Sequence, residues 1–135
     1  MTIQYFGDET RPNAIVIRST AMVSGIQFYS PPDYSQQIGL MSRPMGYVVP
    51  AHFHNEVERK ISQTQEVLII REGKCLVTLF DANFDSSEKI ILEKGDVILL
   101  AAGAHKIEML SDCQILEVKQ GPYAGSNDKS QIQEK

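Results

Sequence analysis

The sequence predicts an all-β domain, built as a sandwich or a barrel with little helix. Turn signals recur about every 8–12 residues between Gly25 and Gly121, which is the spacing of short strands in such folds. No apolar period of 3.6 residues persists for three turns, so amphipathic helices are not expected. The chain has 135 residues, of which 42% are hydrophobic and 22% are charged, and this is enough to enclose one core.

Each expected strand is short, rich in β-branched or aromatic residues, and bounded by turn residues. The expected strands occupy 14–18, 25–29, a stretch within 37–54, 66–80, 90–92, 97–100, 107–110 and 115–118. Gly73 is expected to form a hairpin inside the fourth of these segments. Turns are expected at 30–33, 93–96 and 111–112. The segment 55–65 is expected to be irregular or to hold one helical turn.

One domain is expected over residues 1–123, with its motif core at about 37–120, followed by a tail. Residues 124–135 contain only two apolar side chains, so this polar tail is expected to be mobile. The net charge of −4 argues against nucleic-acid partners, because a phosphate-binding surface is basic. No apolar run approaches about 20 residues, so no membrane span is expected. Cys75 and Cys113 lack a CxxC spacing and are interpreted as reduced thiols of a cytoplasmic protein.

All three histidines lie in two short segments that are typical of strands or strand ends. In a strand, positions i and i+2 point to the same face, so His52 and His54 would project together and could share one ion. The pair taken alone fits unliganded histidines equally well. Glu66 opens an apolar strand, where burying an unpaired carboxylate costs on the order of several kcal/mol. His105 follows the strand at 97–100, and three imidazoles with one carboxylate suit Mn, Fe, Co, Ni, Cu or Zn.

These segments resemble the two motifs of the cupin family. The family's first motif places a glycine before His-x-His, and then a glutamate before a second glycine. Gly46, His52 and His54 match its first half, and Glu66 and Gly73 match its second half. The second motif runs from a glycine to a final histidine, and residues 95–105 are similar to it. The resemblance implies a double-stranded β-helix, or jelly-roll barrel, that binds a metal through His52, His54, Glu66 and His105.

The first motif departs from the family pattern in its spacing. Residues 55–65 separate His54 from Glu66, whereas the family usually has three or four residues there. Glu58 fits the spacing counted from the histidines, and Glu66 fits the spacing counted back from Gly73. We favour Glu66 because it lies in a strand of fixed direction, and Glu58 stays open as the alternative ligand.

The second motif departs in two ways. Ala101 stands where proline is usual, and only one residue separates Gly103 from His105. A deletion of one residue turns a strand side chain to the other face, but a turn with glycine can absorb it. If His105 pointed outward, the two other histidines and Glu66 would still form a facial triad. Five further residues near the motifs could contact substrate, although surface positions explain them more simply: Arg43, Tyr47, Lys119, Gln120 and Tyr123.

The resemblance implies a broad range of activities. Cupins carry out reactions as varied as dioxygenation, isomerisation and decarboxylation, and a fold does not choose among them. We expect a divalent-metal-binding cupin that acts on a small polar metabolite, of isomerase or dioxygenase type. Two alternatives stay open: a cupin that binds or senses a small ligand without turnover, and a metal-free cupin of the sugar-nucleotide epimerase type, with a histidine and a tyrosine as acid and base. The resemblance also implies a homodimer, for which exposed strand edges give a physical basis.

Overall fold

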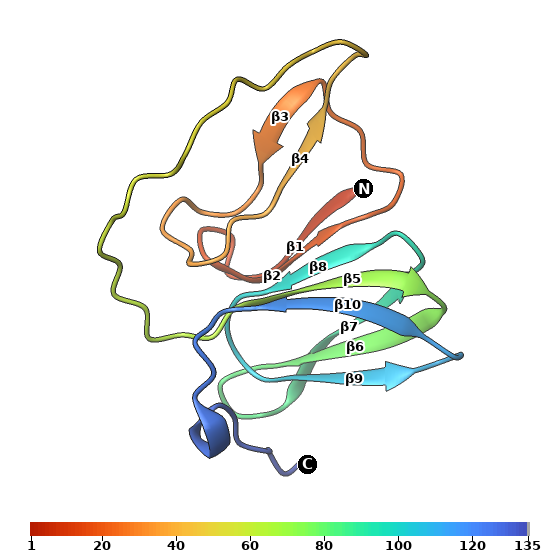
Figure 1. Ribbon diagram of the computed structural model, residues 1–135. Helices are drawn as coiled ribbons and strands as arrows, with labels where there is room; N and C mark the ends of the chain where they lie inside the picture. The colour runs from red at the N-terminus through yellow and green to blue at the C-terminus, as the bar shows by residue number, and fades with distance from the viewer. Residues whose placement is uncertain (135) are drawn as a thin grey trace.

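The computed structural model describes residues 1–134 and consists mainly of β-strands and their connections (Figure 1). The all-β class predicted from the turn spacing is therefore confirmed. The strands are β1 (Ile3–Gly7), β2 (Pro12–Ile17), β3 (Gly25–Phe28), β4 (Gly39–Ser42), β5 (Glu66–Glu72), β6 (Lys74–Phe80), β7 (Ser86–Glu93), β8 (Val97–Leu100), β9 (His105–Met109) and β10 (Gln114–Lys119). A 3₁₀ helix, η1 (Gly125–Asn127), follows the last strand. Within residues 1–134, no helix is long and apolar enough to cross a membrane.

Two antiparallel sheets face each other across the main hydrophobic core. One sheet has five strands in the order β1-β2-β8-β5-β10, and the other has three strands in the order β7-β6-β9. Alternate residues of both sheets point into the space between them, and those buried there include Val16, Ile70, Val77, Leu92 and Ile98. The two sheets still end in free edges at β1, β10, β7 and β9. The described strands therefore form an open sandwich and do not close into a barrel.

The chain passes from one sheet to the other at Gly73, between β5 and β6. The hairpin predicted at Gly73 is wrong, because β5 pairs with β8 and β10 whereas β6 pairs with β7 and β9. Gly73 has a φ of +87°, and a Cβ at this position would collide with the backbone carbonyl oxygen of Asp112. A glycine with positive φ allows a sharp change of direction both in a hairpin and in a crossing between two sheets. The sequence pattern does not say whether the next strand pairs in the same sheet.

A buried carboxylate holds the turn between β7 and β8. Asp96 is only 4% exposed. Its side chain accepts hydrogen bonds from the backbone N–H groups of Ser19 and Glu93, both at 2.8 Å, and from Arg18 Nη1 at 3.1 Å. Arg18 also donates to the carbonyl oxygen of Ile91 at 2.6 Å. These bonds join the end of β2 to β7 and β8 at one end of the sandwich.

The outer face of the five-stranded sheet is covered by the chain that follows β3. Ile15 and Leu99 are fully buried on this face and pack with Tyr34 and Ile38. β3 and β4 form a separate two-stranded sheet, which stands away from the sandwich (Figure 1).

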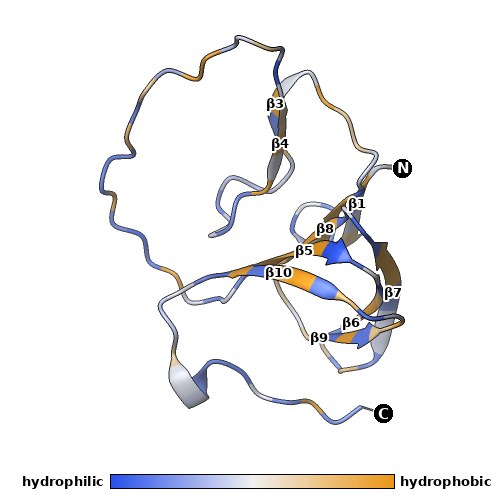
Figure 2. Cartoon of the chain, turned by 45° about the vertical axis from the view of Figure 1, so that its right-hand side comes forward, coloured by the Kyte–Doolittle hydropathy of each residue, from blue (hydrophilic) through white to orange (hydrophobic). Residues whose placement is uncertain are grey.

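The chain between β4 and β5 has neither strand nor helix, and we call residues 43–64 the arm. The strand expected within 37–54 is confined to β4, and the prediction of a strand at His52 and His54 is wrong for the single chain. The segment 55–65 is irregular and contains no helical turn. Both views show the arm arching clear of the sandwich (Figures 1 and 2). A strand needs a partner for its backbone hydrogen bonds, and none of the described strands lies beside the arm.

Candidate functional site

At one end of the sandwich, polar side chains replace apolar ones on the inner faces of the sheets. Along β5, Leu68 and Ile70 belong to the core, so Glu66 points to the same side two positions earlier. Along β9, Ile107 packs against the core, and His105 lies two positions before it. Alternation along the two strands therefore turns both side chains to the inner face. Glu66 and His105 are each the first residue of their strand, and they meet at one end of the sandwich, one from each sheet.

Glu66 and His105 are in direct contact. His105 Nε2 lies 2.9 Å from Glu66 Oε1, and the Glu66 side chain is 13% exposed. The hydrogen bond from His105 is the main cause that lowers the pKa of Glu66 from 4.5 to about 2, and it outweighs burial, which acts in the opposite direction. Because folding lowers this pKa, the contact stabilises the protein above pH 4.5, and that stability is lost as the pH falls towards about 2.

A second carboxylate, Glu117, joins this cluster, and the sequence analysis missed it. On β10, Ile115 packs against the core, and Glu117 follows on the same face. The register of β10 on β5 places Lys119 opposite Glu66. The hydrogen bond between the two carboxyl groups raises the pKa of Glu117, and burial and the charge of Glu66 add to this effect. The end of the sandwich thus carries two carboxyl groups, one imidazole and one ammonium group.

Replacing Glu117 by glutamine is expected to stabilise the protein at pH 7. Folding raises the pKa of Glu117, so its ionised form opposes the folded state as the pH rises above the unfolded-state pKa. Removing the charge should raise the free energy of unfolding by about 0.5 kcal/mol, and the gain should shrink at pH 4. Urea unfolding of Glu117→Gln measures this, with the exposed Glu108→Gln of β9 as the control. An unchanged or lower free energy of unfolding at pH 7 would contradict the expectation.

The cluster faces a pocket of about 750 Å³ between the edge strands β9 and β10. Its wall includes Glu66, His105, Glu117 and Lys119, beside apolar groups such as Ile107. Pockets that combine an apolar wall with a few converging polar groups are typical binding sites for small molecules.

The C-terminal tail forms most of the remaining wall of this pocket. Lys119 Nζ lies 3.0 Å from the Asp128 carboxylate, and the Asp128 side chain is 9% exposed. Lys106 Nζ lies 2.6 Å from the Glu134 carboxylate. These two ion pairs hold the tail along β9 and β10 at the mouth of the pocket.

His52 and His54 lie in the arm, away from Glu66 and His105. Their ring centroids are 5.4 Å apart, with the ring planes inclined at 70°, so the two rings stay together. Glu58, the alternative ligand, is also exposed in the arm. Among residues 1–134, no three His, Cys, Asp or Glu side chains are grouped so that they could hold a metal ion. Within one chain, the four favoured ligands therefore form two separate pairs.

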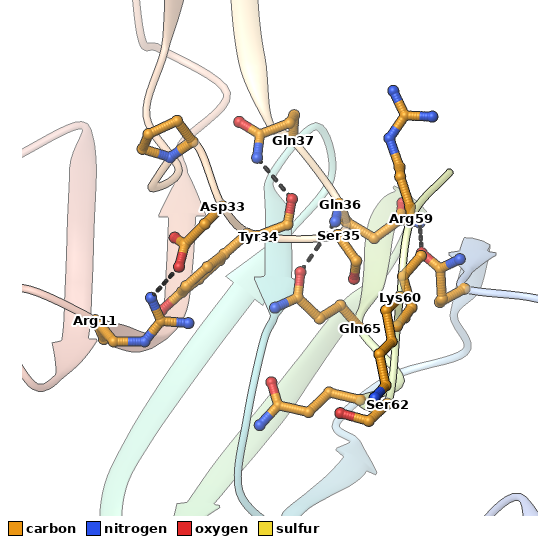
Figure 3. Close-up of a pocket in the computed structure, with 14 residues that line it drawn as sticks. Arg11, Asp33, Tyr34, Ser35, Gln36, Gln37, Arg59, Lys60, Ser62 and Gln65 are labelled. Carbon is orange, nitrogen blue, oxygen red and sulfur yellow. Dashed lines mark hydrogen bonds and ion pairs between the residues drawn. The ribbon is translucent and has the colours of Figure 1, made fainter. Parts of the chain in front are cut away.

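A larger cavity of about 940 Å³ lies at the root of the arm (Figure 3). Gln65 is 3% exposed, and its side chain accepts a hydrogen bond from the Gln36 N–H at 3.0 Å. The Gln65 carbonyl oxygen accepts a second one from the Gln120 N–H at 2.9 Å. The wall of this cavity contains none of the four favoured ligands. The hydrogen bonds of Gln65 beside this cavity fix the end of the arm to the sandwich.

Comparisons with protein-family models, with curated proteins and with solved structures find no match for this chain. The functional assignment therefore rests on the residues and geometry described above.

Proposed function

We propose that the chain is a metal-binding cupin whose site lies where Glu66 and His105 meet at the end of the sandwich. In this proposal the two facing sheets belong to a double-stranded β-helix. The ion is a divalent transition metal, one of Mn, Fe, Co, Ni, Cu or Zn. The ligand is a small polar metabolite, and the reaction is of isomerase or dioxygenase type.

The contact between Glu66 and His105 is the observation that carries this proposal. The two residues come from different motifs and different sheets, yet their side chains approach to 2.9 Å on the wall of a pocket. A carboxylate whose pKa is lowered to about 2 is charged at neutral pH and is a suitable oxygen ligand. Imidazole is a common nitrogen ligand for the same metals.

One chain in this arrangement does not supply a complete set of ligands. Glu66 and His105 give two donors, Glu117 beside them does not complete a metal-binding group of three among the described residues, and His52 and His54 lie in the exposed arm. Protein metal sites of this kind use three or four side chains, so two donors alone would hold an ion weakly. The proposal therefore requires that an arm packs against the sandwich.

A metal-free acid–base site is the second candidate, and the Glu66–His105 pair itself favours it. A carboxylate that accepts a hydrogen bond from an imidazole can orient the ring for proton transfer. This is the arrangement expected of the sugar-nucleotide epimerase type, in which a tyrosine is the second group. Within residues 1–134, no tyrosine lines the pocket that contains Glu66, so we favour the metal-binding candidate.

Metal titration distinguishes the two candidates. Protein purified without added metal and titrated with Co²⁺ is expected to bind one ion per chain, measured by calorimetry and by the visible absorption of bound Co²⁺. A His52→Ala, His54→Ala, His105→Ala variant serves as the reference for non-specific binding. Equal Co²⁺ binding by the wild type and this variant would favour the metal-free candidate.

A further inference from the structure

We propose that two copies of this chain exchange their arms, so that His52 and His54 of one copy join Glu66 and His105 of the other around one cation. This inference rests on the proposed function and deepens it, because it names the partner that completes the site.

The arm exposes several large apolar side chains. Met45 is 102% exposed, Val48 74%, Phe53 84% and Val57 59%, and no residue from 43 to 64 is buried. Large apolar side chains that are exposed together in one segment often mark an interface. The arm therefore needs a partner surface that covers it.

The three-stranded sheet offers a free edge at β9. β9 pairs with β6 on one side, and its other side has no strand partner among the described residues. The C-terminal tail lies near this edge through the exposed ion pair between Lys106 and Glu134, so an added strand would displace the tail, and an exposed pair of this kind contributes little stability. A free edge of this kind can pair with an extended segment of another chain. The pocket that holds Glu66 and His105 is also lined by Lys106 and Ile107 of β9. A strand added to this edge would therefore extend the wall of the pocket.

The sequence of the arm fits an edge strand at this position. In an extended strand, His52 and His54 share one face, and Phe53 lies on the other. Addition beside β9 with the two histidines inward would continue the polar inner row that contains His105. Pro50 lacks a backbone N–H group, and proline is tolerated in edge strands. The same segment thus supplies both the missing strand and the missing ligands.

The route of the arm favours a second copy over the same chain. Gln65 is fixed at the root by Gln36 and Gln120, and at the other end the arm continues directly from β4. In both views the arm leaves its root away from β9, with β5 and β10 between them (Figures 1 and 2). A two-fold pair gives each arm a free edge, and exchange of identical elements is a low-cost route to such a dimer.

Two variants with complementary losses test the exchange. One carries His52→Ala and His54→Ala in the exposed arm, and the other carries Glu66→Gln and His105→Asn in the pocket. The two are co-expressed with different affinity tags, and the mixed dimer is purified through both tags and titrated with Co²⁺. If the arms are exchanged, one of the two sites of the mixed dimer combines the intact arm of one copy with the intact pocket of the other. The second site combines the altered arm with the altered pocket. The mixed dimer is therefore expected to bind one Co²⁺, the wild-type dimer two, and each variant alone none.

The outcomes separate this inference from the proposed function. If the wild type binds Co²⁺ but the mixed dimer does not, the ligands come from one chain; the exchange is then overturned and the proposed function stands. If the wild type binds no Co²⁺, the proposed function fails and the shared site fails with it.

Sedimentation gives a readout that needs no metal. The wild type is expected to have twice the chain mass of 15.1 kDa, and a variant with Val48→Asp in the arm is expected to be a monomer, because Val48 shares the inward face of the added strand with His52 and His54. Val48 is 74% exposed in the single chain, so this change leaves the sandwich intact. A monomeric wild type, or a variant that stays dimeric, would overturn the exchange.

Discussion

Replacing His105 or Glu66 by alanine is expected to lower the affinity for Co²⁺ by about 100-fold or more, because each change removes a ligand and not merely a group that orients one. The two side chains meet at 2.9 Å, so each also loses its hydrogen-bond partner when the other is removed. The effects of the two changes should therefore not add in the double variant. Titration calorimetry of both single variants and the double variant measures this.

Glu72→Ala is the matched control for this series. Glu72 is the last residue of β5, is exposed, and pairs with Lys94 at 2.8 Å at the opposite end of the strand from Glu66. Its replacement should leave the affinity for Co²⁺ unchanged. If His105→Ala and Glu66→Ala bind Co²⁺ as tightly as Glu72→Ala does, the pocket is not the metal site.

The largest loss of stability is expected from Asp96→Ala. The change leaves Arg18 without its carboxylate and leaves the backbone N–H groups of Ser19 and Glu93 without their acceptors. Removing one partner of a buried, hydrogen-bonded pair costs about 3 kcal/mol. Part of the Arg18 side chain reaches solvent, at 26% exposure, so the lower end of the usual range applies.

Urea unfolding of Asp96→Ala measures this loss, with Asp112→Ala in an exposed turn as the control. Asp96→Asn keeps one oxygen acceptor and should lose less stability than Asp96→Ala. A decrease below about 1 kcal/mol for Asp96→Ala would mean that the network at this turn contributes no more than a single exposed hydrogen bond.

The part of the fold that depends on local pattern could be predicted from the sequence. The apolar run at 97–100 is β8, and the segment 66–80 contains both β5 and β6. The sequence does not state which strands pair, so Gly73 was expected in a hairpin although it connects two layers. Pairing is decided by contacts distant in the chain, which periodicity within a segment does not report.

Only part of the candidate site could be predicted, because a sequence pattern reports alternation within a strand and not which strands lie together. The spacing that singles out Glu66 and His105 reflects alternation along two strands, and the two side chains meet. Glu117 was missed because the alternation of its strand is misleading. In the strand 114–119, Ile115 packs against the core and Glu117 follows on the same face. The apolar residues Leu116 and Val118 lie on the other face and are each 47% exposed, so alternation alone would have turned Glu117 outward.

The arm is the element for which the sequence and the single chain disagree most. The alternation around His52 and His54 predicts a strand, but a strand forms only when another strand lies beside it. Within one chain, the described residues offer no such neighbour to the arm. Exchange between two copies would remove this disagreement, since each arm would then lie beside the partner's β9.

Anomalous scattering at the cobalt absorption edge, from crystals grown with Co²⁺, tests the central claim most directly. The account predicts one peak in each pocket, with Glu66 and His105 of one copy and the partner's His52 and His54 at about 2.0–2.2 Å from it. A peak elsewhere, or histidine rings of the arm left in solvent beside an empty pocket, would contradict the account.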